Sequence, residues 1–343
     1  MLFPAQSSKP AERSEAGGQR LKREKALIPD DRKSKPLDVR SLAAEGQEGF
    51  QRTQLAARLG RYSTARENAL QFRDFLLEQN EHKLADALGE CGNYATFRDY
   101  FTIGQVRLAK FCTCKKHLIC PLCAIRRGAK ALRVYLARVE ALMAANPRLR
   151  ASMVSLTVKN GEDLAERYAH LTGCHRKYMR RRSRSRQVGE IRKASAGVFS
   201  IEFKVGKNSG LWHPHIHGIW LHEEDLDKFE LSAQWHDITG DSFIVDVRPL
   251  DMADPVGAFC EVFKYALKFS ELSDTERLHG YKTLKGKRLQ DSFGALRGLD
   301  VEPADCDDLL EELPYIERFF YYVRGSGYVE GDQTGQIHNM IAA

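Results

Sequence analysis

Residues 212–220 read WHPHIHGIW, and this stretch decides how the central part of the chain folds. Polar and apolar side chains alternate, which predicts a β-strand over residues 211–221 because successive side chains of a strand point to opposite faces. His215 and His217 then share one face, where two imidazoles two residues apart can chelate one metal ion. His213 shares that face, but the proline that follows it favours a place near the start or edge of the strand.

The preceding strand supplies a candidate third ligand. Residues 197–205 alternate in the same way, and Glu202 is the only carboxylate on their polar face. A hairpin through residues 206–210 would bring that face beside the histidines. Two histidines and one carboxylate leave open coordination positions, which suits Mn²⁺ or Mg²⁺ acting on a phosphate, with Zn²⁺ as an alternative. His213 is a fourth candidate ligand.

Strand and helix patterns alternate around this hairpin. Alternation predicts further strands over residues 153–159 and 243–247, and helical spacing of apolar residues predicts helices over residues 51–90, 125–145, 224–237 and 255–270. Half-polar strands with helices between them indicate an α+β fold. We expect an antiparallel sheet with helices on one face, preceded by a helical and Cys-rich zinc-binding region.

Composition excludes several classes of protein. The chain is 43% hydrophobic and 29% charged, its mean hydropathy is −0.45, and it has no apolar run near the ~20 residues that a membrane-spanning helix needs. Its first residues lack the pattern of a secretory signal, so we expect a cytoplasmic protein whose eight cysteines stay reduced or bind metal. Residues 1–50 carry too few apolar side chains to fold and are expected to form a disordered tail.

Positive charge is concentrated in one third of the sequence. The formal net charge is only +7, but residues 101–200 hold 22 Lys and Arg against 5 Asp and Glu, whereas the remainder is net acidic. Such a concentration is typical of a protein that binds a phosphate backbone. Residues 176–186 carry much of it, with seven basic side chains and no acidic one, and Tyr178 among them could stack on a base. The candidate DNA-binding residues here are Arg176, Lys177, Arg180, Arg181, Arg182, Arg184 and Arg186.

A cysteine cluster precedes this basic stretch. Cys120 and Cys123 form a CPxC pair whose thiolates can bind one Zn²⁺, and Cys112 and Cys114 complete a four-sulfur set. The C-x-C spacing of the first pair is tight, so either of its members could be replaced as a ligand. The alternatives are His117, His175 and Cys91.

Residues 255–270 (PVGAFCEVFKYALKFS) have the pattern of an amphipathic helix. Five apolar residues form one face, namely Phe259, Val262, Phe263, Ala266 and Phe269. The opposite sector holds Glu261, Lys264, Tyr265 and Lys268. A phenol, whose ordinary pKa is about 10, is a poor nucleophile at neutral pH. The neighbouring lysines, with a divalent cation on the phosphate, would let Tyr265 attack a phosphodiester.

Three segments together resemble the ordered motifs of plasmid rolling-circle replication initiators, which belong to the HUH endonucleases. These segments are residues 154–159, 213–217 and 261–268, and the resemblance extends over about residues 85–300. It implies an HUH-type sheet in which His215 and His217 bind the divalent ion. It also implies that Tyr265 attacks the origin strand, forming a 5′-phosphotyrosine and freeing a 3′-OH primer.

The resemblance carries further implications. Glu261 stands four residues before Tyr265, as in the single-tyrosine branch of these initiators, where it activates water for hydrolytic termination. The Cys-rich segment and the basic residues that follow it, Arg126, Arg127 and Lys130, would form a zinc-containing DNA-binding region. The expected partners are origin DNA, single-stranded at the nick with a hairpin or duplex nearby, and the host helicase and polymerase. No membrane partner is expected, and self-association is left open.

The expected domains follow from these assignments. A tail over residues 1–50 precedes a helical, zinc-containing DNA-binding region over residues 51–147 and the HUH domain over residues 148–300. An acidic segment over residues 301–343 completes or flanks that domain.

Three competing interpretations of the motifs stay open. An HUH transposase or relaxase shares the chemistry, and a histidine-triad nucleotide hydrolase also has alternating histidines. A catalytically silent zinc-containing regulator would bind DNA without nicking it. Four further tyrosines could act as a second nucleophile, namely Tyr281, Tyr315, Tyr321 and Tyr322.

Overall fold

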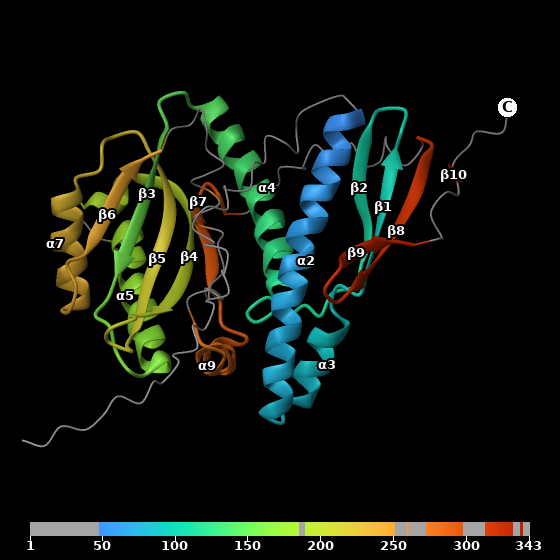
Figure 1. Cartoon of the computed structure of the whole chain (residues 1–343). Coiled ribbons are helices and arrows are strands. Elements are labelled where there is room, and N and C mark those ends of the chain that lie inside the picture. The colour runs from blue at the N-terminus through green and yellow to red at the C-terminus, as the bar shows by residue number, and fades with distance from the viewer. Residues whose placement is uncertain are drawn as a thin grey trace, which may run out of the picture. The chain divides into compact units, whose positions relative to one another are not determined.

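The computed structural model describes residues 48–184, 189–250, 259, 262, 272–297, 313–331 and 337–338. Helices and two antiparallel sheets make up this part of the chain, which confirms the predicted α+β class (Figure 1). None of the described helices is long and apolar enough to cross a membrane. In chain order the elements are α2 (Glu48–Glu78), α3 (His82–Glu90), β1 (Tyr94–Tyr100), β2 (Gln105–Phe111), α4 (Pro121–Ala145), β3 (Arg150–Thr157), α5 (Leu164–Arg184), α6 (Glu190–Lys193), β4 (Ala194–Val205), β5 (Trp212–His222), α7 (Lys228–Thr239), β6 (Val245–Pro249), α9 (Asp274–Leu284), β7 (Gln290–Gly294), β8 (Tyr315–Val323), β9 (Gly327–Glu330) and β10 (Ile337–His338).

The histidine strand lies at the centre of the first sheet. The strand order is β6-β3-β5-β4-β7, so β5 is flanked by β3 and β4. The predicted hairpin between β4 and β5 is present and turns at Gly210, whose φ of 65° is a backbone conformation that favours glycine. It pairs Glu202 with His215 and Ser200 with His217. On the other side of β5, Ser155 pairs with His217 and Thr157 with His215.

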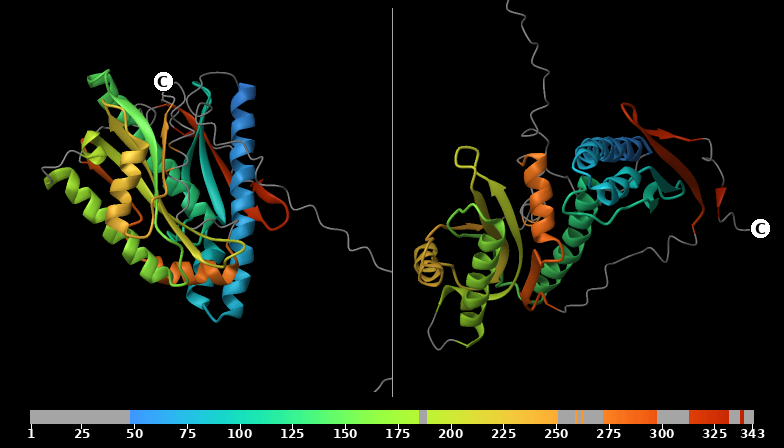
Figure 2. Two further views of the ribbon diagram at one scale, coloured as in Figure 1. Left: turned by 90° about the vertical axis from the view of Figure 1, so that its left-hand side faces the viewer. Right: turned by 90° about the horizontal axis from the view of Figure 1, so that it is seen from below.

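Helices α5 and α7 cover one face of this sheet (Figure 2). The apolar side chains of β5 on that face, Ile216 and Trp220, share a buried cluster with Leu171 and Tyr178 of α5 and Trp235 of α7. The histidines alternate with these residues along the strand, so they lie on the opposite face. The sequence predicted one face covered by helices and one face that carries the polar site. This prediction holds for the part of the sheet that contains His215 and His217.

The opposite face is also partly covered, at the far end of the histidine strand. Ile219 and Leu221 continue the row of His215 and His217, and both are fully buried. They share a cluster with Leu132 and Val139 of α4. Helix α4, which begins at the cysteine cluster, therefore packs on the same face of the sheet as the histidines.

A second sheet, with strand order β10-β8-β1-β2 and β9 paired to β8, was not predicted. Its strands come from residues 94–111 and from residues 315–338, because β1 pairs with both β2 and β8. Helix α2 packs against it through Leu55, which clusters with Phe97 and Phe320. Part of the segment predicted as an acidic flank thus forms strands.

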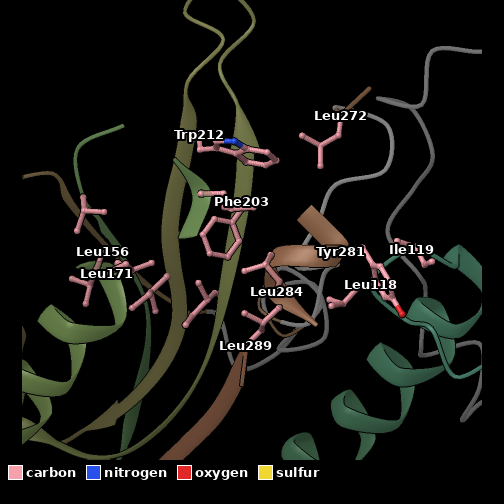
Figure 3. Packing of buried hydrophobic residues seen from close by; sticks show 14 of the residues in the cluster. Leu118, Ile119, Leu156, Leu171, Phe203, Trp212, Leu272, Tyr281, Leu284 and Leu289 are labelled. Atoms are coloured by element: carbon pink, nitrogen blue, oxygen red, sulfur yellow. The ribbon is translucent and has the colours of Figure 1, made fainter. Parts of the chain in front are cut away.

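Helix α9 lies between two groups of core residues (Figure 3). Leu284 points toward Phe203 of the first sheet, whereas Tyr281 lies beside Leu118 and Ile119, which precede α4. All five belong to one buried cluster. The cysteine-rich segment and the histidine sheet therefore share one hydrophobic core.

Candidate functional site

Three side chains of the first sheet converge on one point. Nε2 of His215 lies 3.3 Å from Oε2 of Glu202, and Nε2 of His217 lies 4.0 Å from the same oxygen. Glu202 is fully buried, His215 is nearly so, and the side chain of His217 is 15% exposed. The structure thus brings together the two histidines and the carboxylate that the sequence singled out.

The imidazoles of His215 and His217 each make a further contact through Nδ1. Nδ1 of His217 lies 2.8 Å from Oγ of Ser155, and Nδ1 of His215 lies 3.3 Å from the carbonyl oxygen of His213. A carbonyl only accepts, so Nδ1 of His215 is the donor in this contact, which leaves Nε2 as the nitrogen that could bind a metal ion. Partners on Nδ1 that fix the ring in this way are typical of histidines that bind metal through Nε2.

The residues at this point fit a divalent cation. Nε2 of His215 is buried and makes no hydrogen bond to any residue in the described part of the chain. An ion about 2.1 Å from each ligand atom keeps neighbouring ligands roughly 3.0–3.4 Å apart, close to the shorter distance observed here. Two imidazoles and one carboxylate leave further coordination positions for substrate oxygens.

His213 stands apart from this group. Its Nδ1 lies 2.6 Å from Oδ1 of Asn160, and it is not among the residues whose ligand atoms converge. Burial lowers the pKa of His213, and the neighbouring His215 and Lys204 lower it further. In the arrangement observed, His213 contacts Asn160 through its ring and His215 through its carbonyl oxygen, and a role as a direct ligand stays a prediction.

The predicted tyrosine helix is described at two positions only. Phe259 and Val262 are helical and fully buried, and both belong to the cluster that contains Ile219 and Leu221. These two side chains therefore pack on the histidine face of the sheet. The four candidate catalytic residues, Tyr265, Glu261, Lys264 and Lys268, lie outside the described residues.

Four cysteine sulfurs form a second candidate metal site, and they differ from the predicted set at one position. The group consists of Cys91, Cys114, Cys120 and Cys123. Cys91, which follows α3, takes the place of Cys112. The reason is the backbone beside β2, where the carbonyl oxygen of Cys112 accepts a hydrogen bond from the amide of Gly92. That contact brings the Cys91 thiol into the cluster.

The sulfur positions fit a tetrahedral ion. The distances from Cys91 to Cys120 and Cys123 are 3.5 and 3.6 Å, and that from Cys114 to Cys123 is 3.6 Å. A zinc ion with four bonds of about 2.3 Å keeps its sulfurs about 3.8 Å apart. All four cysteines are free of disulfides. Hydrogen bonds with the other three thiols, that of Cys114 foremost, lower the pKa of Cys123.

The two histidines considered as ligands of this site lie elsewhere. His117 lies beside Arg127, whose Nη1 is 2.8 Å from Nε2 of the imidazole. His175, on α5, is buried against the ring of Phe199 at 4.3 Å between centroids. Of the three substitute ligands that the sequence offered, Cys91 alone belongs to the group.

Comparison with known proteins places the chain in a family. The model of a family described as "Replication protein" matches residues 105–314, which is more than half of the 343 residues. The chain belongs to the replication protein family. It is also similar to "Protein rep" of Streptococcus pneumoniae serotype 2 (strain D39 / NCTC 7466), with 26% identity over 181 residues. That match covers 48% of this chain and 54% of the relative, so it spans about half the length of that protein. No solved structure matches.

This membership confirms the predicted relation to plasmid replication initiators. The matched residues 105–314 include the CPxC pair, the histidine strand and the tyrosine motif. All residues of both candidate metal sites of the replication protein except Cys91 thus lie within the segment that matches the family.

The predicted DNA-binding residues of the replication protein fall in two places. Near the start of α4, Arg127 and Lys130 are exposed, whereas the Arg126 guanidinium lies over the ring of Phe111 at 4.9 Å. On α5, Arg176, Lys177 and Arg180 are exposed. Arg186 and the side chain of Arg184 lie outside the described residues.

Two arginines of α5 have structural contacts. Arg181 forms an ion pair with Asp237 at 2.5 Å. Arg182 donates hydrogen bonds to the carbonyl oxygens of Ala194 and Ser195 at the start of β4. Ala194 is eight residues from Glu202, or about 26 Å along a strand. The end of α5 therefore lies across the sheet from the candidate metal site and near the opposite end of β4.

The expectation that Tyr178 stacks on a base was wrong. Its side chain is fully buried, with ring centroids 6.2 Å from Trp220 and 5.8 Å from Trp235. Leu171, Cys174 and Tyr178 follow helical spacing. That pattern of core residues within a basic run was the signal that could have revealed it.

The four further tyrosines are also placed away from the histidines. Tyr281 is buried on α9, and the other three, Tyr315, Tyr321 and Tyr322, belong to β8 of the second sheet. The hydroxyl of Tyr322 donates to a carboxylate oxygen of Glu67 at 2.7 Å.

Proposed function

We propose that this replication protein is a rolling-circle initiator that nicks one strand of a plasmid origin through Tyr265. The observation that carries the proposal is the shared face of the first sheet. Glu202, His215 and His217 converge on that face, and Phe259 and Val262 pack on its neighbouring part. Tyr265 is only three residues from Val262 in the sequence, which supports a place for it near this face.

The reaction divides among residues of this chain. The converging donors of Glu202, His215 and His217 would hold Mn²⁺ or Mg²⁺, which polarises a phosphodiester and stabilises the charge that develops on it. Lys264 and Lys268 favour the phenolate of Tyr265. The phenol proton passes to water, the phenolate oxygen bonds to phosphorus as the bond to O3′ breaks, and O3′ takes up a proton from water to become the primer hydroxyl. Glu261 later accepts a proton from the water that releases the strand.

The exposed basic residues serve a different part of the DNA. Arg176, Lys177 and Arg180 project from α5, which covers the face of the sheet opposite the histidines. They therefore suit duplex or hairpin DNA that flanks the nick. Replacing all three by Gln should flatten the slope of log Kd against log salt by about 2–3 for a flanked origin. Lys83→Gln, an exposed position on α3, is the control, and an unchanged slope in the triple variant would contradict this role.

Adduct formation tests the central step. Single-stranded origin DNA with a label on the 3′ side of the nick should become covalently attached to the wild-type protein with Mn²⁺ or Mg²⁺ and not with a chelator. Tyr265→Phe should abolish the adduct, whereas Tyr321→Phe, on an exposed tyrosine of β8, should retain it. A persisting adduct in Tyr265→Phe would overturn the assignment. Glu261→Ala should retain the adduct but slow its hydrolysis.

Two competing functions predict different outcomes in the same assays. A histidine-triad hydrolase would cleave nucleotide phosphoramidates without a DNA adduct, and a silent regulator would bind DNA without nicking it. Membership in the replication protein family supports the initiator over both.

We also propose that the cysteine cluster holds a structural Zn²⁺. The support is the set of four sulfurs at tetrahedral spacing, together with amide hydrogen bonds to two of them. The amide of Cys114 donates to Sγ of Cys91 at 3.4 Å and that of Lys116 to Sγ of Cys114 at 3.5 Å, as expected around thiolates. Metal content by mass spectrometry tests it. Cys91→Ser should lose zinc and Cys112→Ser should keep it, and the reverse result would restore the set predicted from the sequence.

A further inference from the structure

Arg66 of α2 is a buried cation beside the cysteine cluster. It is 2% exposed, and burying a charged group is costly unless another charge compensates it. Its guanidinium donates to the carbonyl oxygens of Leu88 and Gly89 and to Oδ1 of Asn93, at 2.5, 2.5 and 2.6 Å. All three acceptors are uncharged, and its guanidinium also lies over the ring of Tyr322 at 5.6 Å. No carboxylate in the described part of the chain forms an ion pair with it.

These contacts place Arg66 next to the first ligand of the cluster. The carbonyl oxygen of Leu88 accepts from Arg66 and also from the amide of Cys91, at 3.2 Å. Leu88 and Gly89 belong to the last turn of α3, so Arg66 caps that helix. The end of a helix carries only about half a negative charge, which leaves much of the guanidinium charge uncompensated.

A second buried arginine provides the contrast. Arg277 of α9 is also nearly inaccessible, at 7% exposure, and its guanidinium lies 3.9 Å from the ring centre of Phe72. Arg277 forms an ion pair with Asp274 at 2.7 Å. The chain therefore supplies a carboxylate for this buried guanidinium, whereas the described residues supply only neutral acceptors for Arg66.

We infer that Arg66 balances the negative charge of a metal tetrathiolate formed by Cys91, Cys114, Cys120 and Cys123. Four thiolates and one divalent ion sum to −2, and a buried cation beside Cys91 offsets part of it. Four neutral thiols would give Arg66 nothing to offset. The inference rests on the proposed zinc site and assigns Arg66 as a positioning residue that makes the anionic, metal-loaded form of the cluster the stable one.

Zinc affinity, measured by competition with a chromophoric chelator, separates this role from helix capping. Arg66→Gln should weaken zinc binding about tenfold to a hundredfold, and Arg66→Lys, which keeps the charge, should restore most of it. The control is Arg73→Gln, two turns along α2, where the guanidinium pairs with the half-buried Asp74. That variant should bind zinc as the wild type does.

Each other outcome overturns a distinct statement. Equal losses in Arg66→Gln and Arg66→Lys would show that the hydrogen bonds matter rather than the charge. Unchanged affinity in both variants would remove Arg66 from any role at the metal. A wild-type protein that holds no zinc would instead contradict the proposed zinc site itself. Circular dichroism of each variant with and without zinc checks that the fold is retained, and the affinities are compared among the variants that retain it.

Discussion

Nε2 of His215 on β5 lies 3.3 Å from Oε2 of Glu202 on β4, and the two residues are direct partners in the strand register. The pairing brings an imidazole nitrogen and a carboxylate oxygen to one buried point. In the proposed site Glu202 is the carboxylate ligand, so Glu202→Gln should weaken Mn²⁺ binding at least about tenfold. Isothermal titration measures it.

A matched control is available for that change. Glu190 is a second buried carboxylate, whose oxygens accept from the amide of Asp227 and from Lys193. Glu190→Gln should lower stability without altering Mn²⁺ affinity. Equal Mn²⁺ affinity in Glu202→Gln and the wild type would exclude Glu202 as a ligand.

The hydroxyl of Ser155 contacts the imidazole of His217. Removing this hydroxyl should weaken Mn²⁺ binding at the proposed site. Ser155→Ala loses the 2.8 Å contact with Nδ1 of His217, so Mn²⁺ affinity should fall by about 10–100-fold. Ser152 on the same strand makes a 2.8 Å contact with Nε2 of His222 on the opposite face. Ser152→Ala should therefore leave the affinity unchanged, and a similar drop in both variants would point to a general loosening of β3.

Packing of Phe259, which lies six residues before Tyr265 in the sequence, should affect nicking and not metal binding. Phe259 is fully buried on the histidine face, and Phe259→Leu should slow adduct formation about tenfold or more by displacing Tyr265. Phe293→Leu, on the other face of the sheet, is the control for lost stability. A slower adduct in both variants to the same extent would argue that only stability is involved.

A buried histidine makes stability depend on pH. Burial against Phe199 lowers the pKa of His175 to about 4, and the nearby Asp291 only partly opposes this. The unfolded chain, with a pKa near 6.5, binds the proton first, so stability is full above about pH 6.5 and falls as the pH drops toward 4. At pH 5 this residue should cost about 2 kcal/mol.

Urea denaturation at pH 5 and pH 7 checks this expectation. His175→Gln cannot take up that proton, so its stability should fall less between the two pH values than that of the wild type, by about 2 kcal/mol. Equal losses in the wild type and the variant would mean that other groups account for the acid sensitivity.

The candidate metal site of the first sheet could be predicted from the sequence because the patterns that indicate it are local. Alternation and one short hairpin fix the positions of Glu202 and His215, only thirteen residues apart, without any knowledge of the rest of the chain. Cys91 lacked such a signal. It is a single cysteine more than twenty residues before Cys114, and the fold of α3 and β2 brings it to the cluster.

The second sheet escaped prediction for a related reason. β1 reads YATFRDY, with charged residues in its second half, and is stabilised by β8, whose residues lie more than two hundred positions later. No pattern within residues 94–100 indicates that partner. Tyr178 differs, because its helical spacing with Leu171 and Cys174 was a local signal, although its partners Trp220 and Trp235 come from distant elements.

The pairing of β1 with β8 also has a consequence for synthesis. Ala95 is opposite Phe320, so a ribosome must add about 225 further residues before β1 meets this neighbour. Until then one edge of β1 has exposed amides and carbonyls that another chain could pair with. Translation of the histidine sheet is complete by that time, and a message cut short before β8 would yield a protein with the histidine site but with a strand open to aggregation.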